Sequence, residues 1–183
     1  MSDSLLIVSN ITTLTINNSL CGLDYAGRAD MESGGFQFEQ EFIDSLRCIP
    51  MVVRLKLDTC GIKLKLNHWH QFTQSERQTL VTMPCDCPEN MLAYQTYLQG
   101  LVIRYTGQRA KELEVPAHPP WLSSTVPEQV RTQATTHNLD IANNSWRSLT
   151  PAQRFALIKL SRPSHENRNF VPAMQEFGLA GPV

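Results

Sequence analysis

The segment between Pro88 and Gly107 carries the strongest structural signal in this chain. Its apolar side chains recur every three or four residues, which is the spacing of one face of an α-helix. They are Met91, Tyr94, Leu98, Leu101 and Tyr105. Proline is favoured at the first position of a helix and glycine just past its end. The pattern therefore predicts a long amphipathic helix from about Pro88 to Tyr105.

Shorter helices are predicted on both sides of it. Thr73 and Glu76 have the spacing of a capping box, and Thr150-Pro151 pairs an N-cap residue with a first-turn proline. The expected helices cover about 38–46, 51–60, 73–83, 127–137, 152–161 and 169–178, with a short turn or helix at Trp146. Residues 62–66 and, weakly, 7–16 suit strands, and 52–57 would also suit a strand although we favour a helix there. We therefore expect an all-α fold of six or seven short helices in a single compact domain.

Composition changes near Gly34. Residues 2–20 are rich in Ser, Thr and Asn and lack a helical period, whereas helical signals dominate from Phe36 onwards. We expect 1–33 to be an irregular N-terminal extension, flexible or loosely docked, and 34–183 to be the helical domain. An alternative translation start at Met31 is a hypothesis. Residues 115–127 hold four of the eleven prolines around Trp121, which predicts a rigid connector anchored by that ring.

Charge and composition exclude several classes of partner. The 183 residues include 16 Lys and Arg against 17 Asp and Glu, a net charge of −1, so nothing favours nucleic acid or a membrane surface. No apolar run approaches the ~20 residues of a membrane span, and no signal peptide is evident. No repeat with a period of 20 to 50 residues appears. An odd set of five cysteines fits a reducing compartment, so we expect a cytoplasmic protein of unassigned oligomeric state.

Four cysteines are weak candidates for a metal or redox site: Cys48, Cys60, Cys85 and Cys87. Thiolates bind zinc and iron–sulfur clusters, and His68 and His70 lie among them in the sequence. However, one residue separates Cys85 from Cys87, whereas common zinc sites place two to four between their cysteines. Buried structural cysteines are therefore favoured, and a metal-binding or redox protein is the alternative.

A basic segment is the main candidate for binding an anionic group. Its side chains are Arg147, Arg154, Lys159, Arg162 and Arg168, whereas the stretch 29–46 is acidic and lacks Lys and Arg. The basic side chains could hold an anionic cofactor or an acidic protein surface, or the two segments could pack together within the fold. His165 and Glu166 form a weaker acid–base candidate. No enzyme motif is visible, so we assign no catalytic residue and no cofactor.

Several blocks of residues resemble one known family. They include 36–42, 45–51, 53–58, 60–64, 153–162 and 165–170, together with Trp69, Glu76-Arg77, Pro84-Cys85 and the loop around Trp121. In this order they resemble the nitrate reductase associated proteins of cyanobacterial nitrate assimilation, from about Phe36 to Leu179.

The resemblance implies an accessory role rather than catalysis. The chain would be a non-enzymatic accessory or maturation factor whose protein partner is nitrate reductase, and it could assist acquisition of the molybdenum cofactor. The resemblance supplies no active-site residues to carry over. If the chain presents a cofactor, the basic side chains named above are the expected anion contacts.

Overall fold

The computed structural model describes residues 35–163 and 165–181 and confirms the all-α prediction. The elements are η1 (Gln37–Glu39), α2 (Gln40–Ile43), α3 (Met51–Thr59), β1 (Ile62–Lys63), α4 (Leu66–Gln71), α5 (Gln74–Thr82), α6 (Pro88–Thr106), β2 (Lys111–Glu112), η2 (Pro120–Leu122), α7 (Glu128–Thr136), α8 (Asn143–Ser148), α9 (Pro151–Leu160), η3 (His165–Asn169) and α10 (Phe170–Glu176). The predicted extension 1–33, the strand at 7–16 and the start at Met31 lie outside the described residues.

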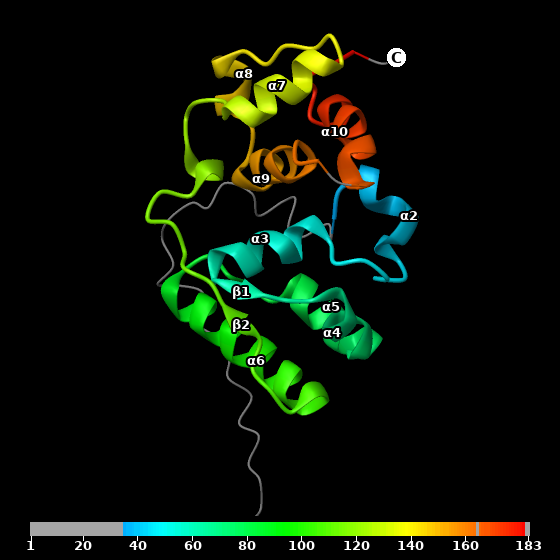
Figure 1. Ribbon diagram of the computed structural model, residues 1–183, viewed down its shortest axis with the longest axis vertical. Coiled ribbons are helices and arrows are strands. Elements are labelled where there is room, and N and C mark those ends of the chain that lie inside the picture. The colour runs from blue at the N-terminus through cyan, green and yellow to red at the C-terminus, as the bar shows by residue number, and fades with distance from the viewer. Residues whose placement is uncertain (1–34, 164, 182–183) are drawn as a thin grey trace, which may run out of the picture.

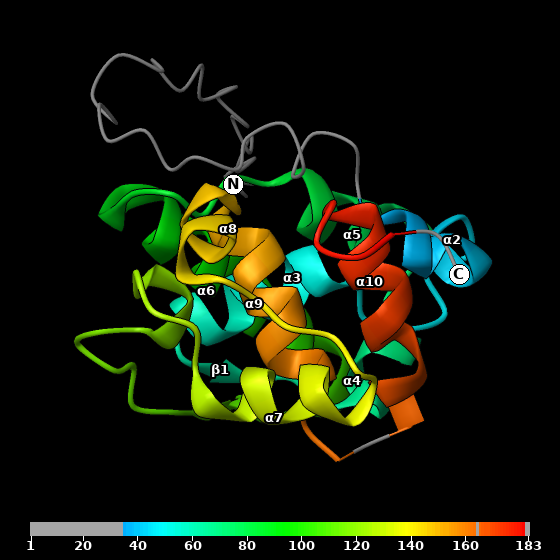
Figure 2. The same ribbon diagram turned by 90° about the horizontal axis from the view of Figure 1, so that it is seen from above.

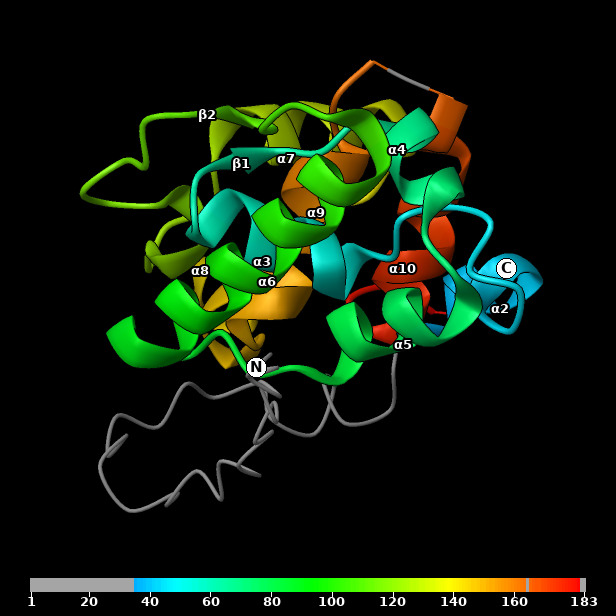
Figure 3. The same cartoon turned by 90° about the horizontal axis from the view of Figure 1, so that it is seen from below.

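The helices form two halves that meet at α3 and α9. Figure 1 shows α7, α8, α9 and α10 in the upper half and α4, α5 and α6 in the lower half, with α3 between them. Seen from above, α7, α8, α9 and α10 lie nearest the viewer (Figure 2), and seen from below, α4, α5 and α6 do (Figure 3). Each half has its own apolar cluster, and α3 contributes to both: Met51 and Leu55 to the upper, Val53 and Leu57 to the lower. Burial on two sides explains why the apolar residues of α3 do not follow one helical stripe.

The two halves repeat one three-helix unit. Helices α3, α4 and α5 begin at residues 51, 66 and 74, and α7, α8 and α9 begin 77 residues later, at 128, 143 and 151. Pro50 and Pro127 precede the first helix of each unit. That helix is followed by a left-handed residue in both, Gly61 with φ +68° and Asn138 with φ +56°. The spacing exceeds the 20 to 50 residues of common repeat proteins, so a search for short periods misses it.

Capping boxes begin the third helix of each unit: the box at Thr73 was predicted, whereas at Thr150 only the N-cap residue was. The backbone N–H of Glu76 donates to the Thr73 hydroxyl at 3.2 Å, and Gln153 donates to the Thr150 hydroxyl at the same distance. The Glu76 and Gln153 side chains accept in return from the threonine N–H groups, at 2.8 and 2.9 Å. Both helices are therefore set at a fixed angle to the short helix before them.

An arginine locks the first unit together. The Arg77 guanidinium donates to the carbonyls of Trp69 (3.0 Å), His70 (2.9 Å) and Leu46 (3.3 Å). The Trp69 indole donates to the same Leu46 carbonyl at 2.7 Å, and its ring lies 5.9 Å from the guanidinium carbon. Carbonyls at the end of α4, which lack the hydrogen bond of a further helical turn, thus gain a charged side-chain donor.

Arg154 makes the same set of contacts in the second unit. It donates to the carbonyls of Trp146 (3.0 Å), Arg147 (2.9 Å) and Ser123 (3.2 Å). The Trp146 indole donates to Ser123 at 3.1 Å, and its ring is again 5.9 Å from the guanidinium. We call each such pair, Trp69 with Arg77 and Trp146 with Arg154, a Trp–Arg lock.

Two parts of the predicted secondary structure are wrong. Strand β1 covers only Ile62–Lys63 of the expected 62–66, because Leu66 already begins α4. Helix α2 ends at Ile43, short of the expected Leu46, which has φ +48° and lies in the connection to α3. Strand β1 pairs with β2, and the Leu113 N–H continues the pairing to the Gly61 carbonyl at 2.7 Å. A non-local partner, invisible to sequence spacing, decided the strand.

Candidate functional site

Three of the five basic candidates bind groups on other elements of the fold, and a fourth, Arg147, donates to the nearby Asn144 side chain at 3.1 Å. The Arg154 guanidinium donates hydrogen bonds to the three carbonyls of its Trp–Arg lock, and Lys159 forms an ion pair with Asp58 at 2.7 Å. Arg168 reaches Glu41 of the acidic segment at 3.5 Å, although both side chains are largely exposed. Among the residues that the structure describes, the acidic and basic segments meet at the Arg168–Glu41 ion pair, while Lys159 joins the second half to α3.

The other two basic candidates lie on the surface and far apart. Arg147 is exposed near the end of α8, and Arg162 is exposed beyond the end of α9. Helix α9 has ten residues between them, and a rise of 1.5 Å per residue separates its ends by about 15 Å. The structure therefore does not gather the five basic side chains into one pocket. The side chains of His165 and Glu166 lie outside the described residues.

The cysteine candidates divide into one pair at the last turn of α3 and two others. Cys60 ends α3, Cys85 lies between α5 and α6, and their sulfurs lie 3.8 and 4.0 Å from the consecutive α3 carbonyls of Leu57 and Lys56. Cys48 is half-buried in the connection before α3, and Cys87 is buried directly before α6. Within 35–163 and 165–181 no three or more His, Cys, Asp or Glu side chains form a group that could hold a metal ion.

A buried lysine, which the sequence reasoning missed, lies beside the thiol pair. Lys56 on α3 is 2% exposed, and its ammonium donates to the carbonyls of Val81 (2.6 Å), Met83 (2.8 Å) and Leu80 (3.5 Å). It also lies 5.7 Å from the ring centre of Tyr94 on α6. These carbonyls end α5, so the ammonium ties α5 to α3. A lysine between two buried leucines of α3 was the available signal.

Electrostatic effects in this cluster are strong. Burial lowers the pKa of Lys56 to about 8, against attraction from Cys85 and Asp86, which raises it. The hydrogen bond from the Cys85 thiol lowers the pKa of Cys60, because it stabilises the thiolate form of the acceptor. The same bond, followed by burial and the charge on Cys60, raises the pKa of Cys85. Ionisation is therefore easier at Cys60 than at Cys85.

Comparison of equivalent positions in the two three-helix units shows which side chains both units share and which occur in the first unit alone. The Trp–Arg lock and the capping box occur in both units, so structure alone accounts for Arg154 as it does for Arg77. Lys56, Cys60 and Cys85 are different: residues 77 positions later are Gln133, His137 and Arg162. The lysine–thiol cluster is thus specific to the first half, and the shared architecture does not need it. It is the best candidate for chemistry in the described part of the chain.

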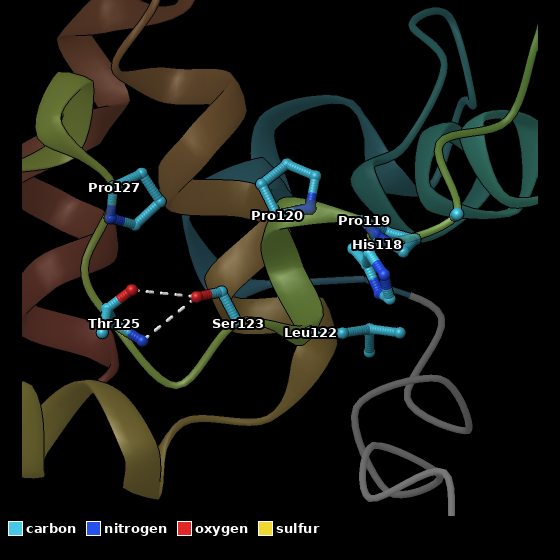
Figure 4. A pocket seen from close by; sticks show the side chains of 8 residues that line it. His118, Pro119, Pro120, Leu122, Ser123, Thr125 and Pro127 are labelled. Carbon is cyan, nitrogen blue, oxygen red and sulfur yellow. Dashed lines mark hydrogen bonds between the residues drawn. The ribbon is translucent and has the colours of Figure 1, made fainter.

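The proline-rich connector forms an open pocket of about 530 Å³ (Figure 4). Its walls are Ala117, His118, Pro119, Pro120, Leu122, Ser123, Thr125 and Pro127. The Ser123 and Thr125 hydroxyls bond to each other at 3.0 Å along one side. Trp121 anchors the connector, as predicted, since it is buried and meets Phe155 edge-on at 5.2 Å. Most of the side chains that line the pocket are therefore apolar, and the buried Trp121 ring fixes the segment that carries them.

Comparison with known proteins gives one match. The model of a family described as conserved nitrate reductase-associated protein matches residues 35–177. No curated protein and no solved structure matches the chain. In the described part of the chain, no helix has both the length and the apolar character needed to cross a membrane.

Proposed function

Because the chain belongs to the conserved nitrate reductase-associated protein family, we propose that it is a non-enzymatic accessory factor for nitrate reductase. It acts in the cytoplasm by contacting the reductase directly, and the step it assists is acquisition of the molybdenum cofactor. The family match over 35–177 carries this proposal, because it spans both three-helix units and the connector between them.

The connector is the surface that we propose contacts the reductase. Leu113, Val115 and Leu122 are 45%, 41% and 47% exposed, which makes half of the large exposed apolar side chains among the described residues. Exposed apolar side chains that gather on one segment are typical of protein interaction sites. Prolines hold the backbone of this segment in one conformation, so little entropy is lost when a partner binds.

Arg147 and Arg162 are the basic side chains best placed to contact an anionic cofactor or an acidic patch of the reductase. Both are exposed, and Arg147 donates to the Asn144 side chain of its own helix, whereas Arg154 and Lys159 bind groups on other elements. Guanidinium groups form paired hydrogen bonds with phosphate and carboxylate oxygens. Their separation indicates two contacts rather than one pocket.

Co-purification with nitrate reductase, with and without its molybdenum cofactor, tests the proposal. Leu122→Glu should lower the recovered reductase at least tenfold, because it places a charge in the apolar contact. Leu66→Glu is the matched control, since Leu66 is 48% exposed but lies on α4. Equal recovery by wild type and both variants would contradict the connector surface, and no recovery by wild type would contradict the accessory role.

Charge reversal at Arg147 and Arg162 separates binding from cofactor acquisition. The double variant Arg147→Glu, Arg162→Glu should still bind the reductase through the connector, but the reductase should gain less cofactor and less activity. Arg104→Glu is a control for charge, because Arg104 is exposed on α6 in the other half. Full cofactor loading with the double variant would remove these two arginines from the proposal.

A further inference from the structure

We propose that Cys60 and Cys85 form a reversible dithiol–disulfide site that reacts with low-molecular-weight disulfides of the glutathione type. This goes beyond an accessory role toward nitrate reductase and does not depend on it.

Both sulfurs lie at the last turn of α3. The Cys60 sulfur lies 3.8 Å from the Leu57 carbonyl, and the Cys85 sulfur lies 4.0 Å from the Lys56 carbonyl, one residue earlier. The two thiols are close enough to shift each other's pKa. A disulfide joins its sulfurs at about 2 Å, so the pair closes when both side chains turn toward each other.

The environment assigns the two thiols different roles. Cys60 is half-buried at the end of a helix, and the hydrogen bond that it accepts favours its thiolate. The thiolate is the form that attacks disulfides. Cys85 is 4% exposed and remains a thiol while Cys60 is charged. Cys60 is therefore the attacking thiol, and Cys85 is the resolving thiol.

The reaction balances in two steps. The Cys60 thiolate attacks one sulfur of the small disulfide, which leaves a mixed disulfide on Cys60 and releases one small thiolate. Cys85 then loses its proton and attacks the Cys60 sulfur, which releases the second small thiolate. Two electrons pass from the protein dithiol to the small disulfide, which becomes two thiols, and an excess of small thiol reverses both steps.

The first step prepares the second. Once Cys60 carries the mixed disulfide, it is no longer a charged acceptor, so its hydrogen bond and its charge cease to raise the pKa of Cys85. Burial still opposes ionisation of Cys85, but the neighbouring Lys56 ammonium favours it. Lys56 is fixed there by the carbonyls at the end of α5. A positive charge beside a buried thiol is what the resolving step requires.

Comparison of the two units indicates that the fold itself does not require the two thiols. The second half builds the same three helices with His137 and Arg162 at the positions of Cys60 and Cys85, so the fold does not need a thiol at either place. The disulfide would close a loop of about 25 residues that contains β1, α4 and α5. Such a cross-link should raise the melting temperature by about 5–10 °C.

Thiol mapping of the full-length protein tests the proposal. The reduced protein is incubated with glutathione disulfide, its free thiols are alkylated, and its peptides are analysed by mass spectrometry. We expect a peptide pair linked through Cys60 and Cys85, lighter than the reduced pair by two hydrogen atoms and restored by glutathione. Cys85→Ser should stop at a stable glutathione adduct on Cys60, and Cys60→Ser should form neither product.

Cys48→Ser is the matched control, because Cys48 is also half-buried and should leave the Cys60–Cys85 link intact. A link from Cys60 or Cys85 to any other cysteine would overturn the proposal. The proposal would also be overturned if both Cys60 and Cys85 of the wild-type protein could still be alkylated after incubation with glutathione disulfide alone. The wild-type map decides the matter even if a serine variant fails to fold, and it requires no nitrate reductase.

Discussion

Replacing Lys56 by methionine should remove a pH dependence of stability that only this side chain supplies. Methionine has a similar length and no charge, so Lys56→Met keeps the packing of α3 while it removes the ammonium. In the folded protein Lys56 is 2% exposed and burial lowers its pKa from the ordinary 10.5 to about 8. The unfolded chain leaves it in water, where the ordinary value applies.

The direction of the effect follows from proton binding. Below pH 8 the lysine is protonated in both states, so it adds no pH dependence. Between pH 8 and 10.5 the folded protein releases this proton while the unfolded chain keeps it, and the free energy of unfolding therefore rises with pH. The whole pKa difference corresponds to about 3 kcal/mol, of which about 2.5 kcal/mol falls between pH 7 and pH 10.

Urea unfolding under reducing conditions, followed by circular dichroism at pH 7, 8, 9 and 10, measures this contribution. Folding also shifts the pKa of other groups, lowering that of Cys60 and raising that of Tyr94, so the quantity of interest is the difference between wild type and Lys56→Met. We expect that difference to shift in favour of wild type as pH rises. Lys63→Met, at an exposed position in β1, controls for the loss of one positive charge. A difference that stays flat or falls from pH 7 to 10 would refute the reasoning.

Three other substitutions test the structural reading. Arg77→Met and Arg154→Met should each lower the free energy of unfolding by about 2–4 kcal/mol, because each leaves three carbonyls without their charged donor. Arg104→Met removes only an exposed ion pair and should cost under about 1 kcal/mol; unequal losses at the two locks would contradict their equivalence. Gly61→Ala should cost more than about 2 kcal/mol, since φ is +68° and the new Cβ would lie 2.5 Å from a backbone oxygen. Gly107→Ala, with φ +72° and open space around it, should cost about 1 kcal/mol, and equal losses at the two glycines would mean that the close contact is unimportant.

Helix boundaries were the part most open to prediction. Pro88 and Gly107 bound α6 as expected, and the Thr73 capping box forms with the expected hydrogen bonds. Thr150 caps α9 as expected, and Gln153 completes a capping box there. These signals act within one or two turns of the chain, so their residues meet whatever the rest of the protein does. The connector anchored by Trp121 is similar, because prolines restrict the backbone locally.

The candidate site was less predictable, because its parts meet only in the folded chain. Lys56 and the carbonyl of Val81 are 25 residues apart, and Cys60 and Cys85 are equally far apart. Both thiols were among the predicted candidates, but Lys56 beside them was not. The basic residues were grouped by sequence, whereas the structure spreads them along α9 and binds Arg154 to the fold.

The 77-residue repeat lies between these cases. Its signal is present in the sequence as a tryptophan, then a threonine four residues later and an arginine four residues after that, at Trp69 and again at Trp146. The repeated spacing alone does not show what these residues do. Their role is clear only from the structure, in which each guanidinium donates to carbonyls of the preceding helix. The structure then explains why these residue types recur.

The sequence by itself determined that this chain is helical, where most helices begin and end, and which family it resembles, because caps, prolines and apolar periods act over short distances. Only the tertiary structure decided that the helices form two equivalent units joined at α3 and α9. Only it showed which charges remain on the surface and that a buried ammonium lies beside a thiol pair. Burial and contacts between distant residues set ionisation and reactivity, and neither is a property of sequence spacing.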